Sequence, residues 1–200
     1  RMLAPLVGMD IKDVRIIKPR IGGGFGAKQE MLIEDIVAHL AIATRQPVQL
    51  ELTRAEEFYA SRTRHPQTLT YRTGVDSEGN LVAQELKLVG NTGPYGTHGY
   101  TVQTVAGLRG LSSYNCDNKR FDCAVMYTNI PVPGAYRGYG APQALFGLEA
   151  HMEDIALDLG MDPIEFRRQN WVKVGDEMNI APHLGEQGTT EEELDEYPKV

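Results

Sequence analysis

"IGGGFGAKQE", residues 21–30, places four glycines within five positions around one aromatic side chain, Phe25. Apolar residues at helical spacing follow directly, so a helix is predicted over residues 29–46. Glycine-rich turns that lead into a helix expose backbone N–H groups, and such groups bind anions. The stretch therefore predicts an anion-binding turn before a helix, without identifying the anion. A glycine bend that only connects the chain to the helix is the alternative.

A second glycine loop, "GAYRGYGAPQ" at residues 134–143, repeats this arrangement of glycines, an aromatic residue and a helix that begins near Pro142. Two such loops in one small domain suit an anionic cofactor that is held mainly by backbone groups. Arg137 adds a fixed positive charge, and the rings of Phe25 and Tyr139 offer faces for a flat substrate. A dinucleotide-binding loop is disfavoured, because Phe25 is too bulky for a loop that a pyrophosphate must approach.

The composition is that of an ordinary globular chain, with 200 residues, 42% hydrophobic and 24% charged. A net charge of −7 argues against a nucleic-acid partner. The two cysteines make neither a disulfide framework nor a zinc site, which indicates reduced thiols and a cytoplasmic location. We find no run of about 20 apolar residues, so membrane insertion is not expected.

Two features of the chain ends bear on domain organisation. The chain begins "RMLAPLVGMD", which reads as the interior of a longer sequence, so we expect an excised or processed piece. Near the other end, "EEELDE" at residues 191–196 is typical of a solvated acidic face. The predicted units are one compact domain over residues 1–177 and an acidic tail, expected to be partly disordered, over residues 178–200.

The pattern of apolar residues predicts an α+β fold with a mixed sheet and packed helices. Besides the helix over 29–46, which is expected to bury one apolar stripe, the predicted elements are strands at 14–19, 47–54 and 121–129, a short helix after residue 54, a hairpin over 68–93, and helices over 143–159 and 162–170. The last helix has the strongest start signal, because Asp162 is a good N-cap and Pro163 suits the first helical position.

The two glycine loops resemble the two signatures of the molybdenum-binding subunit of the xanthine dehydrogenase and aldehyde oxidase family, written roughly GGGFGGKE and AFRGFGGPQ. Their order and their separation of about 110 residues match. The segments "RTRHP", "GNTGPY" and "YTNIP" between the loops match as well, and "IALDLGMDPIEFRRQN" resembles the helix pair that follows. The resemblance implies that residues 1–177 are a fragment of the molybdopterin-binding region of a molybdenum hydroxylase large subunit.

The resemblance also implies roles for residues of both loops. The implied cofactor-binding residues are Gly24, Phe25, Gly26, Ala135, Tyr136 and Arg137, of which Phe25 and Arg137 lie near the metal through their backbone. Tyr139 is implied to stack on the substrate ring. Gln29 stands where the family usually has a substrate-binding glutamate, and Glu30 follows it. Arg109 is the candidate for a substrate-contacting arginine of the purine enzymes.

The implied reaction is oxidative hydroxylation of a purine, another N-heterocycle or an aldehyde, with water as the oxygen source. The implied cofactor is molybdopterin-bound molybdenum, with a cytosine dinucleotide form as one option. Electrons pass to iron–sulfur clusters and FAD in other domains or subunits, which are the implied partners together with the rest of the molybdenum subunit. The family's general base is a glutamate in a GxGE-type segment that these 200 residues lack. We therefore expect no catalytic residue in this chain and no turnover by the chain alone.

Two other classes of function stay open at this point. One is a cofactor-binding or assembly module without chemistry, such as a divided large subunit that shares its active site with a partner chain. The other is an unrelated phosphate-binding domain. Among the histidines, His98, in the glycine-rich segment 90–100, is the candidate to approach the pocket, and structural roles are expected for His39, His65 and His151.

Overall fold

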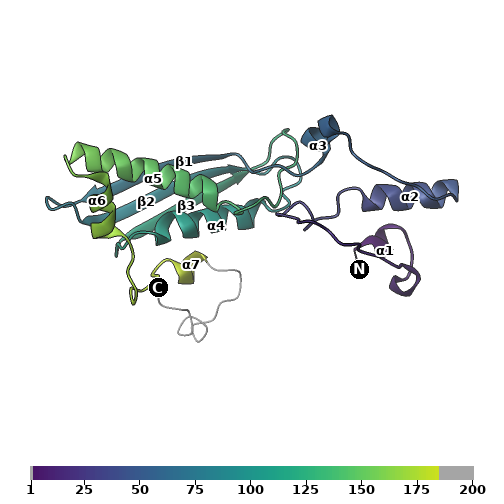
Figure 1. Cartoon of the computed structure of the whole chain (residues 1–200), viewed down its shortest axis with the longest axis horizontal. Helices are drawn as coiled ribbons and strands as arrows, with labels where there is room; N and C mark the ends of the chain where they lie inside the picture. The colour runs from purple at the N-terminus through teal and green to yellow at the C-terminus, as the bar shows by residue number, and fades with distance from the viewer. Residues whose placement is uncertain (1, 185–200) are drawn as a thin grey trace.

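The computed structural model describes residues 2–184 of the chain. Its elements, in chain order, are α1 (Leu3–Leu6), a 3₁₀ turn (Ile11–Asp13), α2 (Glu34–Thr44), α3 (Arg54–Ala60), β1 (Gln67–Val75), β2 (Leu81–Asn91), α4 (Gly99–Ser112), β3 (Lys119–Met126), α5 (Ala141–Asp158), α6 (Pro163–Asn170) and α7 (Ala181–Leu184). Figure 1 shows the sheet with α4 to α7 as one body, from which α1, α2 and α3 extend at one end. We call residues 63–184 the packed layer and residues 2–62 the N-terminal arm.

The predicted hairpin is confirmed as β1 and β2, which pair antiparallel with Tyr71 opposite Leu86. Its turn is held by Asp76, whose side chain accepts hydrogen bonds from the amides of Glu78 and Asn80, each at 2.9 Å. The Asn80 side-chain amide also donates to this carboxylate at 2.9 Å, and that bond together with the backbone hydrogen bonds holds the pKa of the Asp76 carboxyl below its usual range. Local turn chemistry of this kind can be recognised from sequence, and the hairpin follows from it.

The mixed character of the sheet comes from β3, which pairs parallel to β2 with Phe121 beside Leu86. A parallel pair needs a long crossover connection, and α4 supplies it. No helix was predicted over these residues, and Gly107 and Gly110 are residues that weaken a helical pattern. The structure explains both glycines, since a Cβ at Gly110 would lie 2.6 Å from the Tyr71 hydroxyl and a Cβ at Gly107 would press on the Phe121 ring.

The core lies between one face of the sheet and the helices α4, α5 and α6. Its fully buried side chains include Leu86, Leu111, Leu148, Met152 and Phe166. The opposite face of the sheet is polar, with Arg72, Arg120 and Lys87 each 3.6 Å from Glu85. The sheet therefore has one packed face and one charged face, and the predicted α+β fold with a mixed sheet and packed helices is confirmed.

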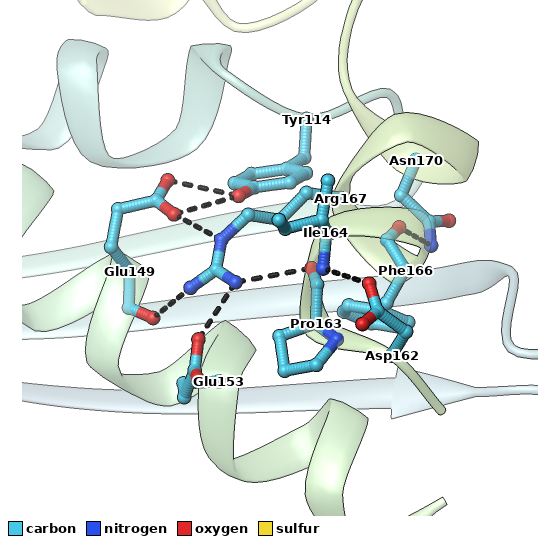
Figure 2. A network of polar contacts seen from close by, with 9 residues as sticks. All are labelled: Tyr114, Glu149, Glu153, Asp162, Pro163, Ile164, Phe166, Arg167 and Asn170. Carbon is cyan, nitrogen blue, oxygen red and sulfur yellow. Dashed lines mark hydrogen bonds and ion pairs between the residues drawn. The ribbon is translucent and has the colours of Figure 1, made fainter. Parts of the chain in front are cut away.

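The predicted start of α6 is confirmed, and a charged network fixes this helix on α5 (Figure 2). The Asp162 carboxylate accepts from the amides of Ile164 and Glu165 at 2.9 and 3.0 Å. Arg167 then reaches across to α5 and pairs with Glu149 and Glu153, each at 2.7 Å. The Tyr114 hydroxyl donates to the same Glu149 carboxylate, and burial together with this carboxylate raises the pKa of the Tyr114 phenol. The network thus joins two carboxylates, one guanidinium and one phenol.

The N-terminal arm departs from the sequence predictions. Residues 14–19 and 47–54 form no strand, because no segment of residues 2–184 pairs with them. The helix predicted over 29–46 begins at Glu34, whose carboxylate accepts from the amides of Leu32 and Ile33. Its apolar stripe is not buried, since Ile36 and Leu40 keep 48% and 45% of their surface exposed.

The segment that follows α6 returns to the packed layer. Ile180 is buried, and Met178 and Leu184 pack beside it against Leu86 and Leu111. The predicted tail thus begins within a packed segment, and residues 185–200 lie outside the described residues. Within residues 2–184, no helix is long and apolar enough to cross a membrane.

Candidate cofactor and substrate site

The two glycine loops, although about 110 residues apart in sequence, touch each other. Gly26 has a φ of 101°, and a Cβ there would collide with the Ala135 carbonyl and lie 2.8 Å from the Tyr136 nitrogen. Ala135 is buried at this contact. Only glycine meets both requirements, a left-handed backbone and the close approach of a second chain segment. The contact between Gly26 and Ala135 therefore defines the centre of the site.

The packed layer holds the second loop in place from two sides. The Gly134 amide donates to the Thr63 carbonyl at 3.0 Å, where Thr63 and Pro133 form a short bridge. At the other end of the loop, Gly140 has a φ of 99° and lies so close to α4 that a Cβ would collide with the Val102 carbonyl. The loop is thus fixed between Thr63 and α4, directly before α5 begins.

A pocket of about 370 Å³ lies at the junction of the loops. It is lined by Phe25, Gly26, Gln29, Thr101, Tyr136, Arg137, Gly138 and Tyr139. Six of these are residues that the resemblance singled out, while Thr101 and Gly138 were not predicted. Gly24 and Ala135 adjoin the pocket through their loops without lining it. Arg109 lies in the last turn of α4 with an exposed side chain, and the structure does not bring it to this pocket.

The two pocket aromatics that flank the loop contact have unusual backbones. Phe25 and Tyr139 have φ values of 50° and 48°, in the left-handed region that bulky residues rarely adopt. Such conformations persist where the surroundings impose them, and they gather at functional sites. Here the guanidinium of Arg137 lies 5.4 Å from the centroid of the Phe25 ring, so a cation–π contact joins the two loops.

A second arginine, Arg64, contacts the second glycine loop through a hydrogen bond and a ring contact. Arg64 donates from Nη2 to the Arg137 carbonyl at 2.8 Å, and its guanidinium lies 4.5 Å from the centroid of the Tyr136 ring. Its Nη1 donates to Gln143, whose amide in turn donates to the His65 carbonyl. The carbonyl of Arg137 is therefore turned toward Arg64.

Several residues that line the pocket have backbone amides that are unpaired within the described part of the chain. Among residues 2–184, the amides of Phe25, Gly26, Tyr136, Arg137 and Gly138 donate to no protein acceptor. Unpaired amides beside an arginine and close to the start of α5 suit an anionic group that is rich in oxygen acceptors. In the same part of the chain, no three His, Cys, Asp or Glu side chains are grouped to hold a metal ion.

Charged side chains lie behind the pocket wall. Glu30 pairs with Arg62 Nε and lies 3.0 Å from His98 Nε2, and the other ring nitrogen of His98 is hydrogen-bonded to the Tyr139 hydroxyl. His98 thus approaches the pocket through Tyr139. Beside it, burial and, to a smaller extent, the neighbouring His98 lower the pKa of His65 from 6.5 to about 4. The sequence singled out His98 but not its contacts in this cluster, whose members come from four separate segments.

The fold and the site together define a cofactor-binding domain, in which two backbone loops present donors and ring faces to one pocket. Residues 1–171 match the family described as the molybdopterin cofactor-binding domain, and the chain belongs to that family. The resemblance inferred from the two glycine loops is thereby confirmed.

Relatives and solved structures agree with this assignment. The chain is 40% identical over 164 residues to the xanthine dehydrogenase molybdenum-binding subunit of Escherichia coli O157:H7, which covers 82% of the chain and 22% of that subunit. It is 38% identical over 173 residues to the nicotinate dehydrogenase large molybdopterin subunit of Eubacterium barkeri, covering 86% of the chain and 41% of that subunit. The aldehyde oxidoreductase of Desulfovibrio desulfuricans superposes with a TM-score of 0.81 at 32% identity, over 88% of this chain and 19% of that one. The chain therefore spans less than half the length of these relatives.

Proposed function

We propose that this chain forms part of the wall that binds cofactor and substrate in a molybdenum hydroxylase acting on a purine, another N-heterocycle or an aldehyde. The observation that carries the proposal is the contact between Gly26 and Ala135, which gathers three aromatic rings and several unpaired amides around one pocket. Xanthine dehydrogenase, nicotinate dehydrogenase and aldehyde oxidoreductase subunits among the relatives support this class of reaction.

Each group of residues has a distinct task in this proposal. The molybdopterin cofactor is bound by the backbone of the two loops, around Gly24, Phe25 and Gly26 and around Ala135, Tyr136 and Arg137. The cytosine dinucleotide form of this cofactor is one option. Tyr139 packs on a flat substrate, and Gln29, exposed at the pocket, both donates and accepts hydrogen bonds to orient it. The bound cofactor supplies the hydroxylation, with oxygen from water. Arg109 has no task at this pocket.

The remaining parts of the enzyme lie outside these 200 residues. We propose that the general base comes from the rest of the molybdenum subunit and that iron–sulfur and FAD domains or subunits take the electrons, in the cytoplasm. The chain alone is then expected to show no turnover. Hydroxylase activity of the purified 200-residue chain would contradict this part of the proposal.

The test is metal and pterin analysis of the full-length protein, purified with its partners, in three forms: wild type, Gly26→Ala and Gly22→Ala. A Cβ at Gly26 meets the backbone of the second loop, whereas one at Gly22 meets nothing within 4 Å. We expect stoichiometric molybdenum with a pterin in the wild type and in Gly22→Ala, and a marked loss of both in Gly26→Ala.

The alternatives predict other results. Folded wild-type protein without molybdenum or pterin would overturn the proposal and favour a binding or assembly module. A copurifying chain that carries the base would instead identify a divided subunit with a shared active site. Unchanged metal content in Gly26→Ala would show that the loop contact is not needed for cofactor binding.

A further inference from the structure

Behind the pocket wall, Glu30 of the first glycine loop lies 3.0 Å from His98 Nε2, and the other ring nitrogen of His98 is hydrogen-bonded to Tyr139 of the second loop. We infer that Glu30 and His98 are positioning residues, which hold the ring of Tyr139 at a set orientation for a flat substrate. The inference rests on the proposed function, because it assigns a role to Tyr139 within that pocket. It assigns a role to Glu30, whose carboxylate contacts other side chains and does not line the pocket.

The Glu30 carboxylate is fixed from several sides. Its side chain is only 14% exposed and forms an ion pair with Arg62 Nε, while its other oxygen lies 3.0 Å from His98 Nε2. Gly134 of the second loop leaves the space for it, because a Cβ there would lie 2.7 Å from Glu30 Oε1. A half-buried carboxylate with two partners and a close backbone neighbour has little freedom to move.

The carboxylate favours one arrangement of protons on the neighbouring imidazole. An ion-paired carboxylate has no proton to donate, so Glu30 Oε1, 3.0 Å away, favours a proton on His98 Nε2. In the neutral tautomer with the proton there, Nδ1 has a free lone pair and accepts from the Tyr139 hydroxyl. The contact with Glu30 thus bears on the hydrogen bond that holds Tyr139.

The Tyr139 ring is constrained in two further ways. Its backbone has a φ of 48°, and the His98 ring meets it edge to face, with centroids 5.4 Å apart and planes at 86°. The hydroxyl, the backbone and the ring contact together define one orientation of a side chain that lines the pocket. Affinity for a flat ligand depends on this orientation, because a ring that must be ordered on binding weakens the complex.

The experiment is a double-mutant cycle in the full-length protein with its partners, using Tyr139→Phe, His98→Phe and the double variant. The dissociation constant of 2-hydroxyquinoline, a flat heterocycle that is already oxygenated beside its nitrogen, is measured by calorimetry. KM and kcat for quinoline, and the molybdenum and pterin content, are measured for each form. His39→Phe is the matched control, because His39 is an exposed residue of α2 that bonds only to the Asp35 carbonyl.

Each single variant is expected to raise the dissociation constant and KM by about tenfold, the worth of one well-formed hydrogen bond, with kcat changed by less than about twofold. The double variant is expected to be no weaker than either single variant, because both remove the same link. Glu30→Ala removes the carboxylate that faces His98 Nε2 and is expected to raise the dissociation constant and KM by a similar factor, and an unchanged dissociation constant in this variant would overturn the role of Glu30. His39→Phe should match the wild type.

Different outcomes would contradict the positioning role and the proposed function. Two results in protein with normal cofactor content would overturn the positioning role. One is a dissociation constant in the double variant that rises by the product of the two single effects. The other is an unchanged dissociation constant in Tyr139→Phe. Failure of the cofactor-loaded wild type to bind 2-hydroxyquinoline would overturn it as well. If His98→Phe does not fold, Tyr139→Phe, which removes a single oxygen atom, decides alone. Folded wild type without molybdenum or pterin would instead overturn the proposed function.

Discussion

Helices α2 and α5 both carry apolar residues at helical spacing, yet they lie in different surroundings. In α5, Ala144, Leu148, Met152 and Ala156 are fully buried against the sheet and α4. In α2, no residue is buried. A periodic apolar stripe predicts a helix and identifies its apolar face, but it does not say whether anything covers that face. The same contrast holds between the packed layer and the N-terminal arm as a whole.

The N-terminal arm exposes many large apolar side chains, including Ile11, Ile16, Ile17, Ile36, Leu40, Ile42, Phe58 and Tyr59. Where such side chains form a contiguous patch, that patch usually contacts another protein surface. Nothing among residues 2–184 covers these side chains, and the chain spans only part of its relatives' length. The arm and the packed layer should therefore respond differently to the same substitution.

The largest contrast is expected for a pair of leucines. Leu148→Ala in α5 removes a fully buried side chain and should lower the free energy of unfolding of the chain by about 2–5 kcal/mol. Leu40→Ala in α2, which is 45% exposed, should change it by less than about 0.5 kcal/mol. Urea unfolding of both variants measures the difference. Equal losses would show that the arm packs in solution as tightly as the layer.

The second contrast concerns pH at the junction of the two regions. The pKa of His65 is lowered from 6.5 to about 4, so between these values the unfolded chain binds a proton that the folded chain does not. The free energy of unfolding should therefore fall as the pH falls from about 7 to 4, by up to about 3 kcal/mol, and stay constant for this group above pH 7.

His65→Gln removes this titration and should flatten the pH dependence, whatever its effect on stability at pH 7. Urea unfolding at several pH values compares the two slopes. An unchanged slope in His65→Gln would mean that the histidine is hydrated, and that the junction opens independently of the packed layer. His151, whose pKa is also lowered by burial, is present in both forms and cancels in the comparison.

The smallest contrast separates two neighbouring arginines of α6. Arg167→Met breaks the pairs with Glu149 and Glu153 shown in Figure 2 and leaves the Tyr114 phenol beside an unpaired carboxylate, which should cost about 1–3 kcal/mol. Arg168→Met removes one exposed pair with Glu165 and should cost less than about 0.5 kcal/mol. Thermal unfolding of both variants tests this, and similar shifts would show that the network adds nothing to helix docking.

The parts of the fold that local signals specify were predictable. The turn at Asp76 and the cap at Asp162 bond to their own neighbours, so the hairpin and α6 could be read from short stretches. Strands predicted at 14–19 and 47–54 did not form, because a strand needs a partner that the sequence cannot display. α4 was missed for the opposite reason, since its glycines serve tertiary contacts with Tyr71 and Phe121.

The candidate site was predictable only as far as the two loops. Their glycines and aromatics stand together in the sequence, and the family resemblance paired them. The link from Glu30 through His98 to Tyr139 was not visible, because it joins three distant segments by side-chain contacts. Arg109 was proposed from the resemblance without a secure register, and the structure places it away from the pocket. Its role in the full-length protein stays a prediction.

The contact between Gly26 and Ala135 also constrains the order in which the chain acquires its structure. The entropy cost of closing a loop grows with its length, and this closure spans the hairpin, α4 and β3. Contacts between neighbouring segments, such as β1 with β2, form at much lower cost and therefore earlier. The pocket is thus completed late, on a sheet that is already assembled. A substitution in either loop is expected to leave the folding rate of the sheet unchanged and to speed the opening of the pocket.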